Sequence, residues 1–356
     1  MSGVTWANLV LVGGNMNRPE RKDIQEVRVQ RTSLEDETHP IRLAVVSGLL
    51  RLYPLDLALA KIREVGYEGM ELWGGQFHGY VLDMVQEKGH DLVLDENRAV
   101  AIKSLCDKHD LQLVCYTPEQ CIYPINYLMH DVCPFDGERL RNRSRQLIRL
   151  SIEAAAALGC GRMVLVSPLW HWHQEGDSYT RVSKREAVEA AIGEVEQFVC
   201  YAESRGVVIL FEPLVYHDSN AIETLEDTAA LLERISSPSL QLLLDTGHIH
   251  VTATRLGYEP VAYFRDHLRR FARRLGHIHV DDNMGQVDSH LLPGVGVVDN
   301  GAMITVLKEY GYQGWISVEL AVLGDYVLPE RAEELLRQAR LYVAGLLASN
   351  PDTSSG

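Results

Sequence analysis

Residues 207–213 read Val-Val-Ile-Leu-Phe-Glu-Pro, and residues 240–248 read Leu-Gln-Leu-Leu-Leu-Asp-Thr-Gly-His. Each stretch contains an apolar run that ends in a carboxylate, and an amphipathic stretch at 224–235 lies between them. Strands that are covered on both faces read as continuous apolar runs rather than as alternating patterns. The two runs are therefore predicted to be parallel strands that an intervening helix connects.

The same strand–helix unit recurs along the chain. Six further apolar runs bring the total to eight, and they lie at 41–46, 69–72, 111–116, 162–167, 276–280 and 315–320. Gly66, Gly206 and Gly311 each follow an amphipathic stretch, where a left-handed helix C-cap favours glycine. Eight alternating units predict an α/β fold, a single-domain (β/α)8 TIM barrel. A doubly wound open sheet is the alternative, but no Gly-x-Gly-x-x-Gly follows a predicted strand.

The barrel is predicted to occupy residues 41–348 of the 356-residue chain, with a flexible tail at 349–356. Residues 1–40 differ from the rest, because the part from Asn17 to Pro40 is polar, mixed in charge and without periodicity. They are predicted to form an irregular N-terminal arm. An arm that clasps a second copy of the chain is the alternative interpretation.

The chain is acidic, with 34 Lys and Arg residues against 49 Asp and Glu residues and a formal net charge of −15. Such a surface repels phosphate backbones and anionic lipids, which argues against nucleic-acid and membrane partners. No apolar stretch reaches the roughly 18 residues that span a bilayer. The six cysteines show no Cys-x-x-Cys spacing. We therefore expect a cytoplasmic protein with reduced cysteines.

Ionisable residues end several predicted strands, at the face of a TIM barrel that carries the active site. Glu212, Asp245 and Glu319 each lie at the end of an apolar run. Burying three carboxylates together is unfavourable unless a cation neutralises them. With neutral His279 they form a set of three oxygens and one nitrogen, which favours Mn²⁺, with Mg²⁺ or Co²⁺ as alternatives. Separate ion pairs with Lys or Arg are the other explanation, but few basic residues lie near the run ends.

Four motifs around these residues are similar to those of a known family. They are Glu212-Pro213-Leu214, Asp245-x-x-His248, His277-x-His279-x-x-Asp282 and Val318-Glu319-Leu320. Together they resemble the xylose-isomerase-like TIM-barrel superfamily. Three more stretches resemble its fructoselysine 3-epimerase and ketose 3-epimerase type, namely Glu71–His78, Tyr116–Glu119 and His290-x-x-Pro293-Gly294-x-Gly296. The catalytic subunits of bacterial C-glycoside deglycosidases are similar at the same level.

The resemblance implies roles for particular residues. The metal ligands would be Glu212, Asp245, His279 and Glu319. The two glutamates would also act as acid and base on opposite faces of the substrate. His248 would bind a substrate oxygen, and Asp218 would contact the substrate. Gly285 stands where ketose 3-epimerases carry an arginine, a departure that the fructoselysine type shares and that favours a larger or substituted substrate.

Four further residues are candidate substrate contacts: Trp73, His78, Glu119 and His290. For His78 and Glu119 the alternative is hydrogen bonding within loops. For Trp73 the alternative is packing at the barrel rim or at a subunit interface. His277 is interpreted as an interior histidine rather than a ligand.

The resemblance implies a divalent-metal-dependent sugar epimerase or isomerase that acts on a keto-sugar or substituted ketose through an enediolate. The alternative is a lyase acting on a 3-keto glycoside or keto-cyclitol, with a small accessory subunit in the deglycosidase case. A nuclease like endonuclease IV fits less well, because Glu71 stands where a histidine is expected and the chain is acidic. The expected partner is a small carbohydrate, and a homo-oligomer is expected by analogy.

Overall fold

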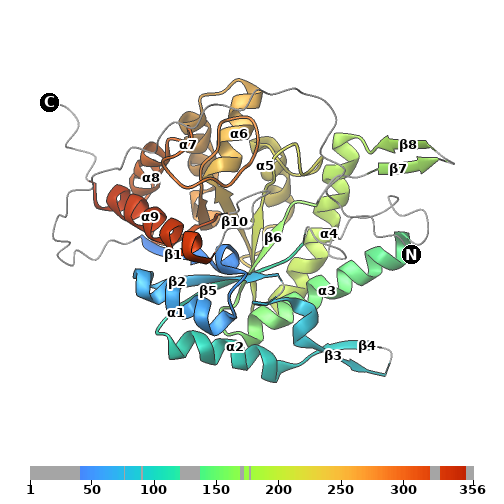
Figure 1. Ribbon diagram of the computed structural model, residues 1–356. Coiled ribbons are helices and arrows are strands. Elements are labelled where there is room, and N and C mark those ends of the chain that lie inside the picture. Colours follow the sequence, from blue (N-terminus) through green and yellow to red (C-terminus); the bar gives the residue numbers. More distant parts are fainter. Residues whose placement is uncertain are drawn as a thin grey trace. The chain divides into compact units, whose positions relative to one another are not determined.

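Eight parallel strands form a closed barrel in the computed structural model (Figure 1). The structure describes residues 41–75, 77–89, 91–120, 137–168, 172–175, 178–320 and 329–349. The barrel strands, in their order around the barrel, are β1 Arg42–Val46, β2 Gly69–Gly74, β5 Gln112–Pro118, β6 Arg162–Val166, β9 Val208–Glu212, β10 Leu240–Asp245, β11 Leu275–Val280 and β12 Trp315–Val318. Because β12 pairs with β1, the (β/α)8 prediction is confirmed and the open sheet is excluded.

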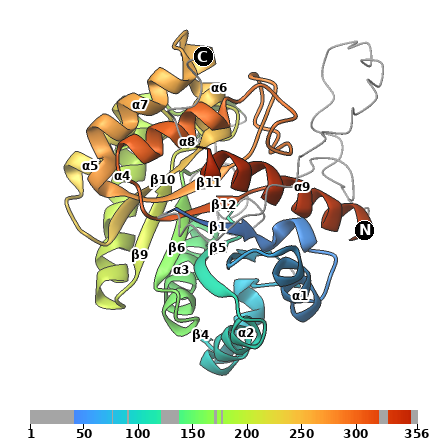
Figure 2. The same ribbon diagram turned by 90° about the vertical axis from the view of Figure 1, so that its left-hand side faces the viewer.

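Helices lie around the outside of the barrel (Figures 1 and 2). They are α1 Leu55–Val65, α2 Glu96–Lys108, α3 Gly137–Ala157, α4 Lys184–Ser204, α5 Leu225–Arg234, α6 Thr246–Leu256, α7 Pro260–Phe271, α8 Asn300–Glu309 and α9 Pro329–Ala348. Short 3₁₀ segments occupy Ser47–Leu50, Val81–Met84 and Ala272–Arg274. The predicted glycine C-cap of α1 is confirmed, since Gly66 adopts a left-handed φ of 100°.

The connection between β10 and β11 differs from the prediction. The eight alternating units predict one helix in each connection, whereas the structure places two helices, α6 and then α7, in this one. Helix α6 begins without a loop, because Asp245 is both the last residue of β10 and the N-cap of the helix. Its side chain accepts a hydrogen bond from the His248 backbone N–H at 2.8 Å. The strand end is therefore fixed by the helix that follows it.

Two antiparallel hairpins interrupt the alternation of strands and helices (Figure 1). Strands β3 (Val85–Lys88) and β4 (Asp91–Leu94) lie between β2 and α2. Strands β7 (Trp172–Glu175) and β8 (Ser178–Arg181) lie between β6 and α4. Each hairpin comes after a barrel strand, so both belong to connections that leave the C-terminal face. The sequence pattern does not predict either of them.

Apolar side chains fill part of the barrel interior, and a larger apolar core lies between the strands and the helices. The inner group comprises Ala44, Val114, Cys115, Val164, Leu210, Leu243 and Trp315. At the N-terminal end of the barrel, the Arg42 guanidinium lies 3.9 Å from the centre of the Trp315 ring. Glu71, His277 and Ser317 are also fully buried, so polar groups begin inside the barrel below the C-terminal face.

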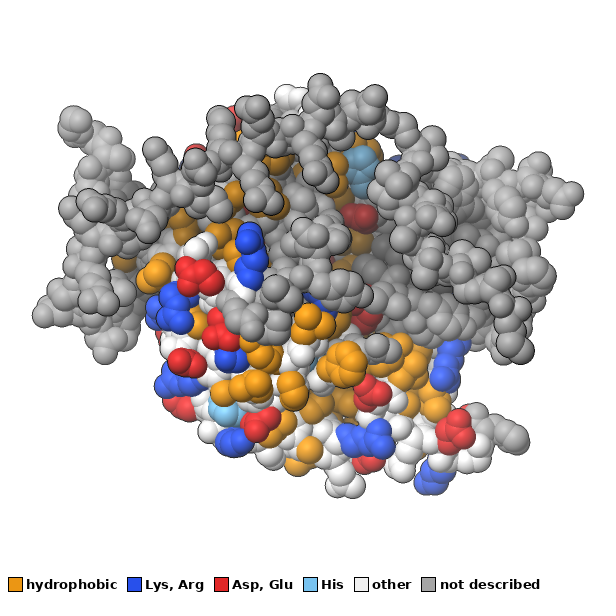
Figure 3. Space-filling view, in the orientation of Figure 1, with side chains coloured by type: hydrophobic (Ala, Val, Ile, Leu, Met, Phe, Trp, Pro, Cys, Tyr) orange, Lys and Arg blue, Asp and Glu red, His pale blue; other side chains and the backbone are white. Residues whose placement is uncertain are grey.

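Acidic and basic side chains are interspersed on the described part of the face in Figure 3. Charged side chains of the described residues form ion pairs, including Arg63 with Asp110 at 2.7 Å and Lys108 with Asp56 at 2.8 Å. Among the described residues, no helix combines the length and apolarity needed to cross a membrane. The predicted arm at 1–40 and nearly all of the predicted tail at 349–356 lie outside the described residues, so these domain boundaries stay predictions.

Candidate metal centre and active site

The four residues predicted to bind a metal meet at the C-terminal ends of four successive strands. Glu212 and Asp245 are the last residues of β9 and β10, His279 lies in β11, and Glu319 directly follows β12. One ligand atom from each lies within 4.8 Å of one ligand atom from every other. Adjacent parallel strands in register produce this convergence, since Asp245 pairs with His279 and His279 pairs with Ser317.

Three of the four converging residues are buried, and Glu319 is partly exposed. Nδ1 of His279 lies 2.8 Å from Oε2 of Glu319 and 3.5 Å from Oε1 of Glu212. Nevertheless Nδ1 of His279, Oε1 of Glu212 and Oδ2 of Asp245 have no hydrogen-bond partner among the described residues. Buried polar atoms are rarely left without a partner. Three oxygens and one imidazole nitrogen at this spacing fit a divalent cation.

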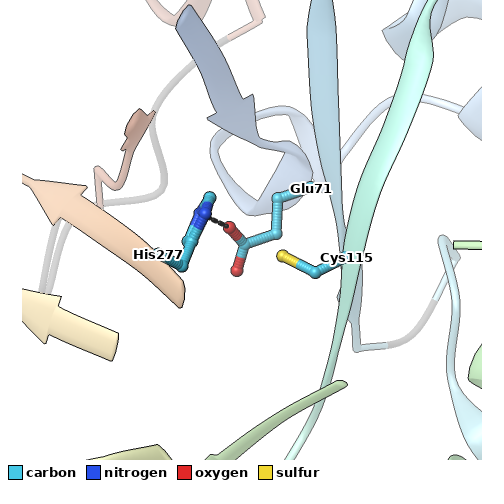
Figure 4. Close-up of side chains that lie close together, drawn as sticks. All are labelled: Glu71, Cys115 and His277. Carbon is cyan, nitrogen blue, oxygen red and sulfur yellow. Dashed lines mark hydrogen bonds and ion pairs between the residues drawn. The ribbon is translucent and has the colours of Figure 1, made fainter. Parts of the chain in front are cut away.

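A fifth buried residue, Glu71 of β2, lies behind His279. Nε2 of His279 is 3.1 Å from each of the two Glu71 carboxylate oxygens. Figure 4 shows the other side of this carboxylate, where His277 donates to it and the Cys115 thiol lies beside it. Burial opposes ionisation of Glu71, but His279 and His277 hold its pKa well below the usual range. His277 is an interior residue, in agreement with the sequence interpretation.

A second chain of charged side chains runs beside the four candidate ligands. Oδ2 of Asp288 lies 3.1 Å from Nε2 of His248 and 2.8 Å from Nε2 of His290. Nδ1 of His290 in turn lies 2.8 Å from Asp281. Burial alone would lower the pKa of both histidines, but the surrounding carboxylates raise it well above the ordinary value. Each of the four ring nitrogens thus faces a protein oxygen, since Nδ1 of His248 also lies 3.2 Å from the Pro213 carbonyl oxygen.

The loop that carries Asp288 and His290 is organised by Asp282. The Asp282 carboxylate accepts backbone N–H groups from Gly294, Gly296 and Val298, each at 2.9 Å. A Cβ added at Gly296 would lie 2.2 Å from the backbone oxygen of Asn283. The Pro-Gly-x-Gly motif is thus explained by the folding of this loop.

The predicted substrate contacts take up two kinds of position. Asp218 is exposed and lies close enough to Asp288, His248 and His290 to interact with them electrostatically. His78 uses both ring nitrogens within the protein, at 3.0 Å from Ser47 Oγ and 3.2 Å from the Tyr53 carbonyl oxygen. The Trp73 ring packs edge-on to His78, with 6.3 Å between ring centroids.

Two glycines and one glutamate complete the description of this rim. Gly48 and Gly75 lie against the Trp73 ring, and a Cβ at Gly75 would be 2.0 Å from it. The Trp-Gly-Gly stretch is therefore a packing requirement as well as a motif. Glu119 follows β5 directly and is half-buried. The substrate-binding roles of Trp73, His78, Glu119, Asp218 and His290 stay predictions.

A comparison of the sequence with known protein families identifies a family with this barrel fold. Residues 59–342 match the family described as "Xylose isomerase-like TIM barrel". This protein belongs to the xylose isomerase-like TIM barrel family. The resemblance that the sequence motifs indicated is confirmed.

Relatives within and around the xylose isomerase-like family are sugar epimerases and related enzymes. Fructoselysine 3-epimerase of Shigella flexneri is 27% identical over 279 residues, which cover 76% of this chain and 86% of the relative. The 3-keto-D-glucoside 4-epimerase YcjR of E. coli aligns with a TM-score of 0.63 at 18% identity, covering 86% of this chain and 99% of that one. An IOLI protein with a bound zinc atom aligns equally well, with 18% identity and coverage of 86% and 98%. At these identities the two solved structures establish the fold.

Proposed function

We propose that this protein is a divalent-metal-dependent epimerase or isomerase that acts on a keto-sugar carrying a substituent. The observation that carries the proposal is the convergence of four ligand atoms from three buried residues and the partly exposed Glu319, and three of these atoms have no hydrogen-bond partner among the described residues. The similarity to fructoselysine 3-epimerase supports sugar epimerisation. Gly285, which has no side chain and a left-handed φ of 87°, supports a substituted substrate because the arginine of ketose 3-epimerases is missing there.

A divalent cation held by these ligands would act as a Lewis acid and stabilise the negative charge that develops on a substrate carbonyl oxygen. Mn²⁺ is the proposed ion because three carboxylate oxygens and one imidazole nitrogen suit it, with Mg²⁺ or Co²⁺ as alternatives. The bound zinc of the IOLI protein adds Zn²⁺ to the ions that need to be compared.

Glu212 and Glu319 are the proposed acid and base. They belong to β9 and to the residue after β12, which β10 and β11 separate, so the two carboxylates approach the site from different directions. One removes the proton next to the carbonyl, and the other returns a proton to the opposite face. Proton transfer by a positioned group accelerates such a step by about 10²–10⁴-fold. His248 is the proposed contact of a substrate oxygen, and His290 is a further candidate substrate contact.

The test is isotope exchange in D₂O with the Mn²⁺-loaded protein. Fructoselysine, a free ketohexose and a 3-keto-glucoside are compared as substrates. We expect solvent deuterium at an inverted carbon in one of the two substituted substrates and much slower exchange in the free ketose. Release of water or of an aglycone would identify the lyase alternative instead. Mn²⁺ binding without exchange or release in any substrate would contradict the proposal.

Two variants test whether the exchange depends on Glu212. Glu212→Gln keeps the size of the side chain but removes a carboxylate proposed both as a metal ligand and as acid or base, so exchange should fall by about 10²-fold or more, and Mn²⁺ binding is measured on the same variant to separate the two roles. Glu189→Gln is the matched control, because Glu189 is an exposed glutamate of α4. An equal effect of both substitutions would contradict the assignment of Glu212.

A further inference from the structure

The carboxylate of Glu71 is completely buried and is surrounded by hydrogen-bond donors. Nε2 of His279 and Nε2 of His277 both donate to it at 3.1 Å. The Thr117 hydroxyl also donates to Oε1 of Glu71. These donors belong to β11 and β5, the latter a neighbour of β2, so the fold holds the carboxylate from two sides. Figure 4 shows this carboxylate pointing across the barrel interior toward His277.

An ionised carboxylate can only accept hydrogen bonds. Contact with Glu71 therefore places a proton on Nε2 of His279. When the imidazole is neutral, its lone pair is then on Nδ1, the atom that faces Glu212 and Glu319. The two ring nitrogens of His279 have separate tasks, since one is held by Glu71 and the other is directed into the ligand cluster.

We propose that Glu71 is a positioning residue that fixes the ring orientation and tautomer of His279 for metal binding, and that Thr117 holds Glu71 in place. This inference rests on the proposed function, because it assumes that His279 is a metal ligand. It assigns a role to two motifs that the proposed mechanism leaves unused, Glu71-Leu72-Trp73 and Tyr116-Thr117-Pro118. Loss of such an outer carboxylate typically weakens metal affinity by about 10–100-fold.

A second metal site at Glu71, Cys115 and His277 is the competing interpretation, because their potential ligand atoms also lie within 4.8 Å of one another. Both oxygens of Glu71 are already occupied by N–H and O–H donors. We therefore expect one Mn²⁺ ion per chain.

The experiment is calorimetric titration of the metal-free full-length protein with Mn²⁺, repeated on four variants. Glu71→Gln should raise the dissociation constant by about 10–100-fold, and the EPR spectrum of the bound Mn²⁺ should change. Thr117→Val should weaken binding in the same direction, and Thr117→Ser, which keeps the hydroxyl, should restore it. Cys115→Ala is the matched control from the same buried cluster and should bind Mn²⁺ as the wild type does.

The outcomes separate this inference from the proposed function. An unchanged dissociation constant in folded Glu71→Gln would overturn the inference and leave the proposed function standing. If Glu71→Gln does not fold, equal affinity of Thr117→Val and Thr117→Ser would overturn it instead. Two Mn²⁺ ions per chain, one of them lost in Cys115→Ala, would favour the second metal site and overturn the positioning role. A wild-type protein that binds no divalent metal would overturn both proposals.

Discussion

The Asp245→Asn variant should be more stable than the wild type once metal has been removed with a chelator. Asp245 is 2% exposed, and its Oδ2 has no hydrogen-bond partner among the described residues. Burial outweighs the attraction of His248 and His290 and raises the pKa of Asp245 from 3.8 to about 6. Asparagine removes the charge but keeps an oxygen for the N-cap of α6, where Asn and Asp are equally effective.

The size of the effect follows from this pKa. A rise from 3.8 to about 6 corresponds to about 3 kcal/mol of unfolding free energy. Because the folded protein binds this proton more tightly than the unfolded chain, ionisation destabilises the fold only as the pH rises from about 4 to about 6. The advantage of Asp245→Asn should therefore be about 3 kcal/mol at about pH 8 and about half of that at about pH 5.

Urea unfolding in EDTA, followed by circular dichroism at both pH values, measures this difference. The same unfolding measurement in Mn²⁺ shows how much metal-dependent stabilisation the substitution removes. At a free Mn²⁺ concentration of 100 times the dissociation constant, the wild type should gain about 2.7 kcal/mol, and Asp245→Asn should gain far less. The reasoning is refuted if the chelated variant is no more stable than the wild type, or if its advantage is the same at both pH values.

Three further predictions concern other parts of the barrel. Burial lowers the pKa of His267 to about 4, so the unfolded chain binds a proton at this histidine more readily than the folded protein does. The unfolding free energy of the wild type should therefore fall by up to about 3 kcal/mol between about pH 6.5 and pH 4. In urea titrations, His267→Gln should lose this part of the pH dependence of stability. Gly296→Ala should lower the melting temperature and the exchange rate together, because its Cβ would meet the Asn283 backbone oxygen. Thr224→Ala should cost about 1 kcal/mol in urea unfolding without changing Mn²⁺ affinity, because it removes only the capping box of α5.

Much of the fold and the convergence of the four candidate ligands could be predicted because both depend on local patterns. Each barrel strand is buried on both faces, so it reads as an apolar run whatever its partners are. Glu212, Asp245 and Glu319 stand out because a carboxylate at the end of such a run needs a neutralising partner. Helix α6 was not predicted, because Asp245 is also its N-cap and the helix begins without the loop that separates the other predicted strands and helices.

The residues that the sequence did not assign depend on contacts between distant segments. Glu71 and His279 are separated by 208 positions, and Asp288 contacts His248 across 40 positions. Glu71 carried a usable signal, because it is a carboxylate inside an apolar run without a basic neighbour. Sequence could not show that its partners are histidines, since strand order and register alone bring β2 and β11 to face each other across the barrel.

The distribution of apolar and polar side chains along the barrel interior indicates from which end a substrate would reach the candidate site. Trp315 and Arg42 lie at the N-terminal end, and the inner apolar group that includes Leu210 and Leu243 fills the interior. Glu71 and His277 add a buried polar layer below His279, and their donors and acceptors are directed at each other. The unpartnered atoms of Glu212 and Asp245 belong to the last residues of their strands. The C-terminal face is therefore the proposed side of approach for a substrate, and His290 lies beside the candidate ligand Glu319 there, with 4.0 Å between Nδ1 of His290 and Oε2 of Glu319.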